Sequence, residues 1–228
     1  MEKIITEFFT ILNYYIKFDW EIILSIAMII ICPVTWNLVA RYEFYTKKLS
    51  TFCGDNRLAA DIFAHCLIEM GIFRNYLFVR VMRNQLKTEY FDDHFIILEI
   101  IGYLILVCGF HLTIFAYYRL GIHGIYYGDY FGVLCKEMVT AFPFSILENP
   151  LYVGSTMMFF GSSILYRSPA GIVLTICAWI MYQFASILEN PMTPLIYSPE
   201  NIEKVRLYYE RKEKERELKQ ENQKQKSQ

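Results

Sequence analysis

The sequence predicts an all-α, polytopic integral membrane protein with about four hydrophobic helical elements and a C-terminal helical hairpin. Hydrophobic residues fill 55% of the 228 positions and aromatic residues 17%, which is more apolar than soluble domains usually are. Long uncharged runs carry most of this content, and about 20 apolar residues are enough for one helix to cross a bilayer. The net charge of −1, without a basic face in the sequence, argues against a nucleic-acid partner.

Four uncharged runs, each close to the length of a membrane-spanning helix, follow one another along the chain. They cover residues 22–40, 100–118, 149–166 and 168–188. A fifth run, residues 58–79, is a weaker candidate for a span. It is interrupted by Asp61, Glu69 and Arg74, and charged side chains are costly inside a bilayer.

The polar residues of this fifth run do not have the spacing of a metal site. Asp61, His65 and Glu69 lie four residues apart, so a helix places them in one stripe. A rise of about 1.5 Å per residue separates the first from the last by roughly 12 Å, which is too far for ligands of one ion. We therefore predict no metal and expect the stripe to face the interior of the helix bundle.

Several glycines follow the run 100–118 at short intervals: Gly121, Gly124, Gly128 and Gly132. Glycine weakens a helix and suits tight turns. This spacing predicts a close-packed turn rather than a continuous helix.

The hexapeptide SILENP occurs twice, at residues 145–150 and 186–191, each time beside an apolar run. The interval between the copies contains Arg167-Ser168-Pro169 near its middle. As one span it is nearly twice too long and buries Arg167, whereas two helices joined at the Ser-Pro turn form a hairpin. The hairpin returns both SILENP copies to the same side of the membrane. The distribution of Lys and Arg in the loops does not distinguish the hairpin from a single final span. The prediction of a hairpin therefore rests on the Arg167-Ser168-Pro169 interruption.

The chain changes character near residue 200, which predicts a membrane-embedded domain at 1–199 and a charged tail at 200–228. Lys, Arg and Glu dominate the tail. Ser198 has the position of a helix N-cap and Pro199 that of the first helical residue. The positive-inside rule places this tail in the cytosol.

Two stretches of the sequence resemble a known enzyme family. Residues 128–200, GDYFGVLCKEMVTAFPFSILENPLYVGSTMMFFGSSILYRSPAGIVLTICAWIMYQFASILENPMTPLIYSPE, strongly resemble the small phosphatidylethanolamine N-methyltransferases of the endoplasmic reticulum. Residues 32–54, CPVTWNLVARYEFYTKKLSTFCG, resemble the segment after that family's first hydrophobic element. The order and spacing of GDYFG, NPxYxGS, SPxG and ExPxTxxIY make this resemblance more specific than a single motif.

The resemblance implies a function, a cofactor and a location. It implies methyl transfer from S-adenosyl-L-methionine to the amine of phosphatidylethanolamine and of its mono- and dimethyl intermediates, which ends in phosphatidylcholine. The substrate is then a phospholipid within the bilayer. The implied location is the endoplasmic reticulum membrane, with a mitochondrial membrane as the alternative, and the oligomeric state is left open.

The resemblance also implies the residues that hold the cofactor. The family's GxG falls on Val107, Cys108 and Gly109, and its pair of glutamates falls on Glu189 and Asn190. One glycine and one glutamate of the family pattern are therefore replaced. Gly109 still permits close approach, and the oxygens of Glu189 and Asn190 can accept hydrogen bonds from ribose hydroxyls or an amino group.

Methyl transfer requires an unprotonated amine aligned with the methyl group. The expected proton acceptors are, in order of preference, Glu148, Asp129 and Tyr152. Nearby aromatic residues either face the methylated ammonium through cation–π contacts or form an interfacial belt: Tyr126, Tyr127, Tyr130 and Phe131.

Two other functions are compatible with the pattern. One is a related membrane methyltransferase that acts on an isoprenylcysteine carboxylate, although the chain has NPLY where those enzymes usually have a His-Pro pair. The other is a non-catalytic membrane scaffold, which the substitutions at Val107 and Asn190 make conceivable.

Overall fold

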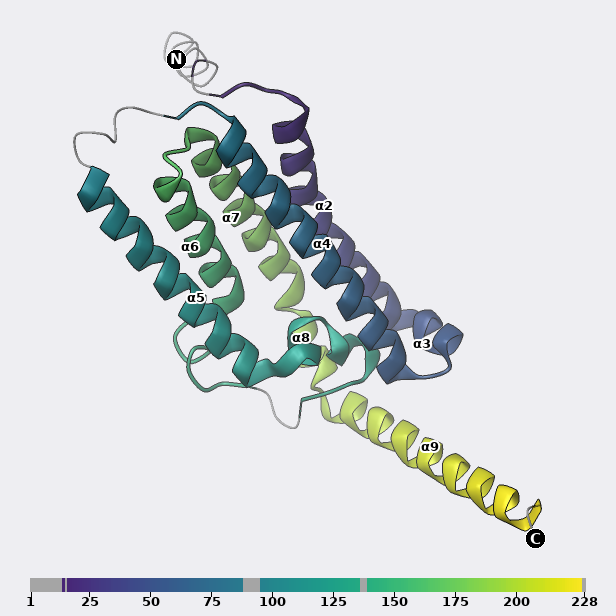
Figure 1. The fold of residues 1–228 in the computed structure, drawn as a ribbon. Coiled ribbons are helices and arrows are strands. Elements are labelled where there is room, and N and C mark those ends of the chain that lie inside the picture. Colours follow the sequence, from purple (N-terminus) through teal and green to yellow (C-terminus); the bar gives the residue numbers. More distant parts are fainter. Residues whose placement is uncertain (1–13, 15, 88–94, 136–138, 227–228) are drawn as a thin grey trace. The chain divides into compact units, whose positions relative to one another are not determined.

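The computed structural model describes residues 14, 16–87, 95–135 and 139–226. Within these ranges the chain forms helices and no strand (Figure 1), so the predicted all-α class is confirmed. The chain divides into two compact units, Met1–Ile187 and Leu188–Gln228.

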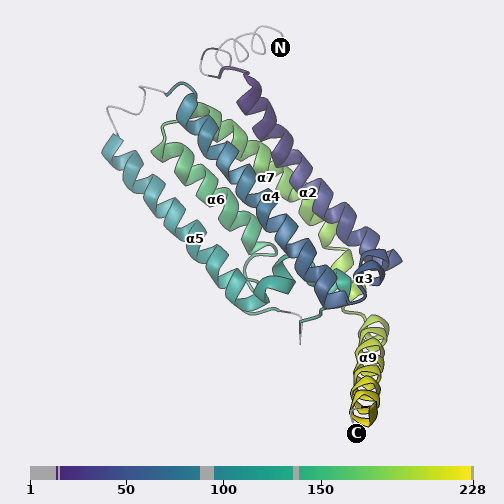
Figure 2. The same cartoon turned by 45° about the vertical axis from the view of Figure 1, so that its right-hand side comes forward.

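The first unit is a bundle of long helices. It contains α2 (Trp20–Thr46), α3 (Lys48–Cys53), α4 (Asn56–Asn84), α5 (Phe95–Ile125), the 3-10 helix η2 (Gly128–Phe131), α6 (Pro150–Leu165) and most of α7 (Pro169–Glu189). Helix α2 lies along α4 and α5 lies along α6, as the views in Figures 1 and 2 agree.

Aspartate caps set the starts of α2 and α4. The Asp19 carboxylate accepts hydrogen bonds from the backbone N–H groups of Glu21 and Ile22, at 3.0 and 3.1 Å. Asp55 caps α4 in the same way. Helix α2 ends where Lys47 takes a left-handed conformation, with φ of 54°. These caps satisfy backbone donors that have no partner inside the helix.

Among the described residues, four helical segments are long and apolar enough to cross a membrane. They are Trp20–Thr46, Asn56–Asn84, Ile96–Phe131 and Pro169–Ile196. The chain is therefore an integral membrane protein. The weaker candidate, residues 58–79, lies within the second of these segments, which begins at Asn56 and ends at Asn84.

The run 149–166 is shorter as a helix than the other apolar runs. It forms α6, which has 16 residues and so rises about 24 Å, less than the roughly 30 Å of hydrocarbon in a bilayer. Pro150 opens this helix, and the turn before Pro169 ends it.

The predicted hairpin of α6 and α7 is confirmed. Arg167 turns the chain with φ of 51°, and the Ser168 hydroxyl accepts a hydrogen bond from the backbone N–H of Gly171 at 3.1 Å. The helices then run antiparallel, since Ser163 Oγ lies 3.3 Å from Thr175 Oγ1 near the turn.

Helices α5 and α6 approach each other closely at glycines. A Cβ atom added to Gly109 on α5 would lie 2.6 Å from the carbonyl oxygen of Gly154 on α6. Seven residues away on each helix, a Cβ atom on Gly161 would lie 2.7 Å from the carbonyl oxygen of Gly102. Two helical turns thus repeat the same contact, and only residues without a side chain allow it.

The hydrophobic core of the bundle lies among α2, α4, α6 and α7. Its members include Ile29, Phe78, Met82, Phe159 and Leu174, all buried. The Phe78 and Phe159 rings pack with centroids 4.5 Å apart and join α4 to the hairpin. This core fixes the faces that α4, α6 and α7 turn toward one another.

The second unit contains α8 (Met192–Ile196) and α9 (Pro199–Lys226). The predicted N-cap is confirmed, because the Ser198 hydroxyl accepts a hydrogen bond from the backbone N–H of Asn201 at 3.3 Å. Ion pairs such as Lys204 with Glu200, at 2.7 Å, lie along α9. The boundary at residue 200 stays a prediction.

Candidate active site

The GDYF turn after α5 is anchored by α2 and α4. Gly121 leaves the helical conformation with φ of 64°, and η2 follows, so the predicted turn is confirmed. Phe131 is fully buried, and the centroid of its ring lies 5.4 Å from that of the Phe63 ring on α4. Tyr130 packs its ring against Phe44 of α2. These contacts hold the turn at the end of the bundle where α2 ends and α4 begins.

A half-buried lysine, Lys47, adds a polar contact to this anchor. Lys47 Nζ donates a hydrogen bond to the backbone carbonyl of Tyr130 at 2.9 Å. Burial lowers the pKa of the Lys47 ammonium group, and the nearby Glu43 carboxylate partly opposes that shift. Partial burial of the charged Lys47 side chain therefore costs some stability, but its hydrogen bond helps to fix the position of η2.

Three tyrosines from separate elements form a row next to this turn. The hydroxyl of Tyr127, just before η2, lies 3.3 Å from the hydroxyl of Tyr152 on α6. The Tyr152 ring stacks on that of Tyr182 on α7, with centroids 4.6 Å apart and planes at 12°. We call Tyr127, Tyr152 and Tyr182 the tyrosine row. The row brings the hydroxyl groups of Tyr127 and Tyr152 and the stacked rings of Tyr152 and Tyr182 to one place.

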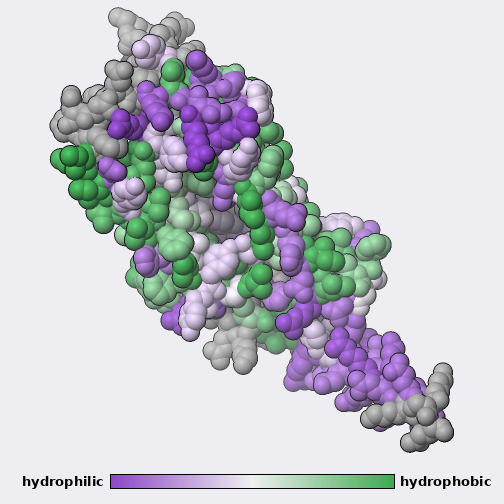
Figure 3. All heavy atoms as spheres, in the orientation of Figure 1, coloured by the Kyte–Doolittle hydropathy of each residue, from purple (hydrophilic) through white to green (hydrophobic). Residues whose placement is uncertain are grey.

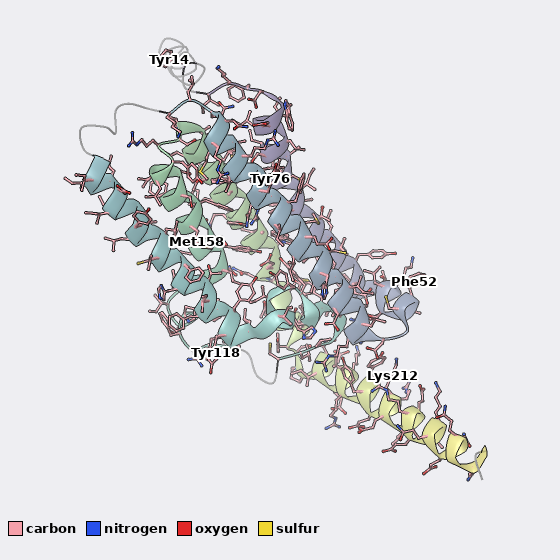
Figure 4. The ribbon with its side chains drawn as sticks, viewed as in Figure 1. Tyr14, Phe52, Tyr76, Tyr118, Met158 and Lys212 are labelled. Atoms are coloured by element: carbon pink, nitrogen blue, oxygen red, sulfur yellow. The ribbon has the colours of Figure 1, made fainter. Side chains whose placement is uncertain are left out.

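Other aromatic residues point away from the bundle. Tyr118 on α5 is 82% exposed and Phe52 on α3 is 90% exposed, and both side chains project outward in Figure 4. Tyr127 and Tyr182 are instead buried. The tyrosine row is thus distinct from the aromatic side chains that face the surroundings.

The two SILENP copies meet at this end of the bundle. Asn149 of the first copy donates a hydrogen bond from Nδ2 to the hydroxyl of Ser186 in the second copy, at 2.9 Å. Because Tyr152 lies one turn beyond Asn149 on α6, the contact between the copies adjoins the tyrosine row. The hairpin therefore brings Ser186, the first residue of the second copy, to the end of the bundle that carries the first copy. That both copies face the same side of the membrane stays a prediction.

The structure places the three expected proton acceptors on neighbouring segments. Tyr152 belongs to the tyrosine row, and Asp129 follows Tyr127 by two residues in η2. Glu148 is exposed and directly precedes Asn149. The roles of these three residues as proton acceptors stay predictions. Of the three, Tyr152 is the residue that contacts Tyr127 and Tyr182.

Two of the four aromatic residues expected near the ammonium are used for packing. Tyr130 and Phe131 are 4% and 0% exposed and fill the space between η2, α2 and α4. Tyr127 joins the tyrosine row, and the Tyr126 hydroxyl bonds to that of Tyr117.

The residues expected to hold the cofactor lie on α5 and at the end of α7. Val107 and Cys108 are exposed, whereas Gly109 faces α6 and allows the close contact with Gly154. The Gly109 contact gives this glycine a packing role that the motif did not reveal.

Glu189 is the last residue of α7, and Asn190 follows it; both belong to the second unit. The cofactor role of these two residues, and of Val107, Cys108 and Gly109, stays a prediction.

The polar stripe on α4 does not face the interior, so that expectation is wrong. Asp61 pairs with His123 of α5, whose Nε2 lies 2.7 Å from the carboxylate, while His65 and Glu69 are exposed. The face of α4 that packs into the bundle instead carries residues such as Phe63, Leu67 and Phe78, and His65 and Glu69 lie outside that face. No group of three or more potential metal ligands occurs in the described ranges.

Arg74 and Tyr182 are two residues of this region that the motifs did not single out. Arg74 lies on α4 with its guanidinium carbon 5.7 Å from the Tyr182 ring. A lone arginine inside an apolar run was the available signal, because such residues are rarely tolerated without a purpose.

Comparison with known proteins gives consistent results. The sequence model of the family described as phospholipid methyltransferase matches residues 97–200. The chain is 37% identical over 188 residues to phosphatidylethanolamine N-methyltransferase A of Dictyostelium discoideum, covering 82% of this chain and 87% of that protein.

Two further relatives are similarly close. Phosphatidylethanolamine N-methyltransferase of Mus musculus is 36% identical, over 82% of this chain and 93% of the mouse protein. Phosphatidyl-N-methylethanolamine N-methyltransferase of Neurospora crassa is 37% identical, over 80% of this chain and 85% of the fungal protein. No solved structure matches the chain.

Proposed function

Since the chain belongs to the phospholipid methyltransferase family, we propose that it methylates the headgroup amine of phosphatidylethanolamine and of its mono- and dimethyl derivatives within the membrane. The product of the full series is phosphatidylcholine. The observation that carries this proposal is the tyrosine row, which places two hydroxyl groups and stacked ring faces beside the GDYF turn and the joined SILENP copies.

The methyl donor that we propose is S-adenosyl-L-methionine. When bound, it supplies an electrophilic methyl group on a sulfonium whose thioether is a good leaving group. The donor set of Glu189 and Asn190 fits such a molecule, since carboxylate and amide oxygens accept hydrogen bonds from ribose hydroxyls and amino groups. Val107, Cys108 and Gly109 are the other residues proposed to hold it.

The tyrosine row suits an acceptor whose hydrogen-bonding capacity changes during the reaction. Each methyl transfer forms an N–C bond, breaks the S–C bond of the donor and releases one proton from the amine. An ammonium group with more methyl groups donates fewer hydrogen bonds, but it keeps its charge. Ring faces stabilise that charge at every stage by cation–π attraction. We therefore propose that the half-buried Tyr152 ring, with Tyr182 stacked behind it and Tyr127 beside it, holds the substrate and its partly methylated products alike.

The chain also needs a route for the released proton. Tyr152 is proposed to relay it: the hydroxyl takes the amine proton as it gives its own proton to the hydroxyl of Tyr127, which lies 3.3 Å away. Glu148 and Asp129 are the proposed carboxylate acceptors. Glu148 is exposed, so it can exchange the proton with water at the membrane surface.

Methyl transfer by purified protein tests this function. The protein in lipid nanodiscs is given radiolabelled S-adenosyl-L-methionine and phosphatidylethanolamine, monomethyl or dimethyl acceptor in separate reactions, and labelled lipids are separated by chromatography. We expect label in the next product of each series. Absence of label with all three acceptors contradicts the proposal and favours the scaffold, whereas label on an isoprenylcysteine substrate alone favours the other methyltransferase.

Two substitutions test the proposed division of roles. Glu189→Ala is expected to weaken donor binding strongly, and Glu148→Ala is expected to spare binding and slow transfer. Calorimetric titration of the donor and initial rates are measured for both. If both variants keep normal affinity and normal rates, the assignment of these residues is wrong.

The proposed location is the endoplasmic reticulum membrane, with the charged tail in the cytosol. The tail is rich in Lys and Arg, which membrane insertion retains on the cytosolic side. Protease treatment of sealed microsomes tests this, since a C-terminal epitope should be removed without detergent. Protection of the epitope contradicts the proposed orientation.

A further inference from the structure

We propose that Arg74 binds the anionic group of a substrate, either the carboxylate of the methyl donor or the phosphodiester of the phospholipid. This inference rests on the proposed function, because it assumes that both molecules reach the tyrosine row. Both groups are oxyanions that a guanidinium binds through two parallel hydrogen bonds.

Arg74 is buried within a membrane-spanning helix. It lies inside α4, eighteen residues after the first residue, and is 9% exposed. A charge at such a position is costly unless an opposite charge or water accompanies it. The buried Arg74 guanidinium therefore needs an anionic or hydrogen-bonding partner to offset the free energy of removing it from water.

Among the described residues, Arg74 has only weak polar partners. Its Nε and Nη2 groups donate to the side-chain oxygen of the adjacent Asn75, at 3.3 and 3.2 Å. Within the described parts of the chain, no carboxylate lies within ion-pair distance of Arg74. Arg80, a half-buried arginine further along α4, differs because it pairs with Glu21 at 2.7 Å. Arg74 thus has donor capacity for an oxyanion from outside the protein.

Two aromatic rings hold the Arg74 guanidinium in place. Its carbon lies 5.4 Å from the centroid of the Phe159 ring on α6 and 5.7 Å from that of Tyr182 on α7. Ring faces attract the charge but accept no bidentate hydrogen bonds. The contacts orient the side chain while leaving most of its N–H donors for a ligand.

The position of Arg74 fits the dimensions of either substrate. The Tyr182 ring lies next to the Arg74 guanidinium and also stacks on the Tyr152 ring. The Tyr152 hydroxyl in turn lies 3.3 Å from the Tyr127 hydroxyl. Two carbons separate phosphate oxygen from amine in the lipid, and three separate carboxyl carbon from sulfonium in the donor. An anion at Arg74 would therefore place a reacting atom near the tyrosine row.

The substitution Arg74→Met tests the proposal with two readouts that move in opposite directions. Removing a buried charge that lacks a counter-ion should raise the Tm of the ligand-free protein, because a methionine of similar length fills the space. Removing the anion partner should weaken binding of one substrate roughly 10- to 100-fold. Arg74→Lys should restore part of the affinity. An arginine that only packs on rings would instead lower the Tm when replaced and leave binding unchanged.

The two sources of the anion are separated by the choice of ligand. Calorimetric titration of wild-type and Arg74→Met protein uses S-adenosyl-L-methionine and its decarboxylated form. If Arg74 binds the carboxylate, wild-type protein prefers the intact donor and Arg74→Met binds both forms equally. If Arg74 binds the phosphodiester, donor affinities are unchanged and the KM for nanodisc phosphatidylethanolamine rises by the same factor.

Arg83→Gln is a matched control, because Arg83 lies on the same helix and contacts Tyr166 near the turn of the hairpin. It should change neither affinity nor KM. The proposal is overturned if Arg74→Met keeps both substrate affinities within about twofold while the wild-type enzyme methylates lipid. Failure of the wild-type protein to methylate any acceptor instead refutes the proposed function, and donor titration still decides whether Arg74 recognises the carboxylate.

Discussion

Tyr152 is the residue whose side chain links the most parts of the candidate site. Its hydroxyl meets Tyr127 and its ring stacks on Tyr182, so one side chain joins the turn after α5 to both arms of the hairpin. Tyr152→Phe removes the hydroxyl and keeps the stack. We expect kcat to fall roughly 10- to 100-fold, the lower part of the range for acid–base groups, with donor affinity unchanged.

The matched control for Tyr152→Phe is Tyr118→Phe, which removes a hydroxyl from an exposed tyrosine on α5. It should leave kcat and affinity unchanged. Rates are measured with saturating donor, and affinity by titration calorimetry. An unchanged kcat in Tyr152→Phe would show that the hydroxyl pair takes no part in proton removal.

Lys47 gives a prediction with a defined direction in pH. Its pKa is lowered by burial, so the folded protein binds its proton less tightly than the unfolded chain does. The resulting cost is fully present below the folded pKa and disappears as the pH rises toward the unfolded value of about 10.4. The stability of wild-type protein should therefore rise relative to Lys47→Met between neutral pH and that value.

Thermal unfolding of wild-type and Lys47→Met protein in the same detergent at stepped pH measures this difference. Lys48→Met is the control, because Lys48 is exposed. A Tm difference between wild type and Lys47→Met that stays constant, or that shifts in favour of the variant as the pH rises, would contradict the assignment of a lowered pKa.

At the scale of elements, the glycine contacts decide how α5 and α6 pack. Gly109→Ala places a Cβ atom 2.6 Å from the Gly154 carbonyl oxygen, so the helices must separate. We expect a loss of about 1–3 kcal/mol in the free energy of unfolding, the usual range for overpacking. Gly71→Ala on α4 meets no atom within 4 Å and should be neutral or stabilising by up to about 1 kcal/mol.

Thermal unfolding and donor titration together separate the two roles of Gly109. A lowered Tm with normal donor affinity supports helix packing alone. Normal stability with lost affinity supports the cofactor role that the family resemblance implies. Equal effects of Gly109→Ala and Gly71→Ala on stability would contradict the tight contact between α5 and α6.

The positions of the helices in the sequence could be predicted, but which side of each helix packs against its neighbours could not. Runs of apolar residues and the Ser168-Pro169 break predicted the spans and the hairpin, because length and chain stiffness determine both. Which side chains meet depends on how each helix is rotated. Gly109 and Gly154 set that rotation through contacts between residues far apart in the chain.

The same limit explains what the motifs missed in the candidate site. Tyr152 could be identified because it lies in a recognisable motif, NPLY. Tyr182 and Arg74 lie in ordinary apolar surroundings, and only packing of the hairpin on α4 brings them together. The expectation that Asp61, His65 and Glu69 face the bundle interior was wrong for the same reason, since no local pattern reports which face of α4 the core covers.

At the scale of the molecule, the helix bundle of the first unit has two chemically different ends. At one end lie the GDYF turn and the joined SILENP copies. At the other, Glu21 pairs with Arg80 and accepts a hydrogen bond from Asn84, and hydrophilic side chains gather over this end in Figure 3. Hydrophobic side chains cover much of the helices between them, as a bilayer requires.

The hairpin fixes which of these ends each loop occupies. Tyr166, next to the turn between α6 and α7, accepts a hydrogen bond from Arg83 in the last turn of α4 at 3.4 Å. The turn therefore reaches the end of the bundle that carries Glu21, although α6 has only 16 residues. Ser145, which precedes α6, lies at the opposite end. These positions predict that the turn and Ser145 face opposite sides of the membrane.

Single cysteines placed in a cysteine-free background test this arrangement in sealed vesicles. Ser145→Cys should react with a membrane-impermeant maleimide from one side only, and Lys87→Cys and Arg167→Cys should both react from the other. In a single final span, position 167 lies in the hydrocarbon and reacts from neither side. Labelling of positions 145 and 167 from the same side would contradict the hairpin, and with it the meeting of Asn149 and Ser186 beside the tyrosine row.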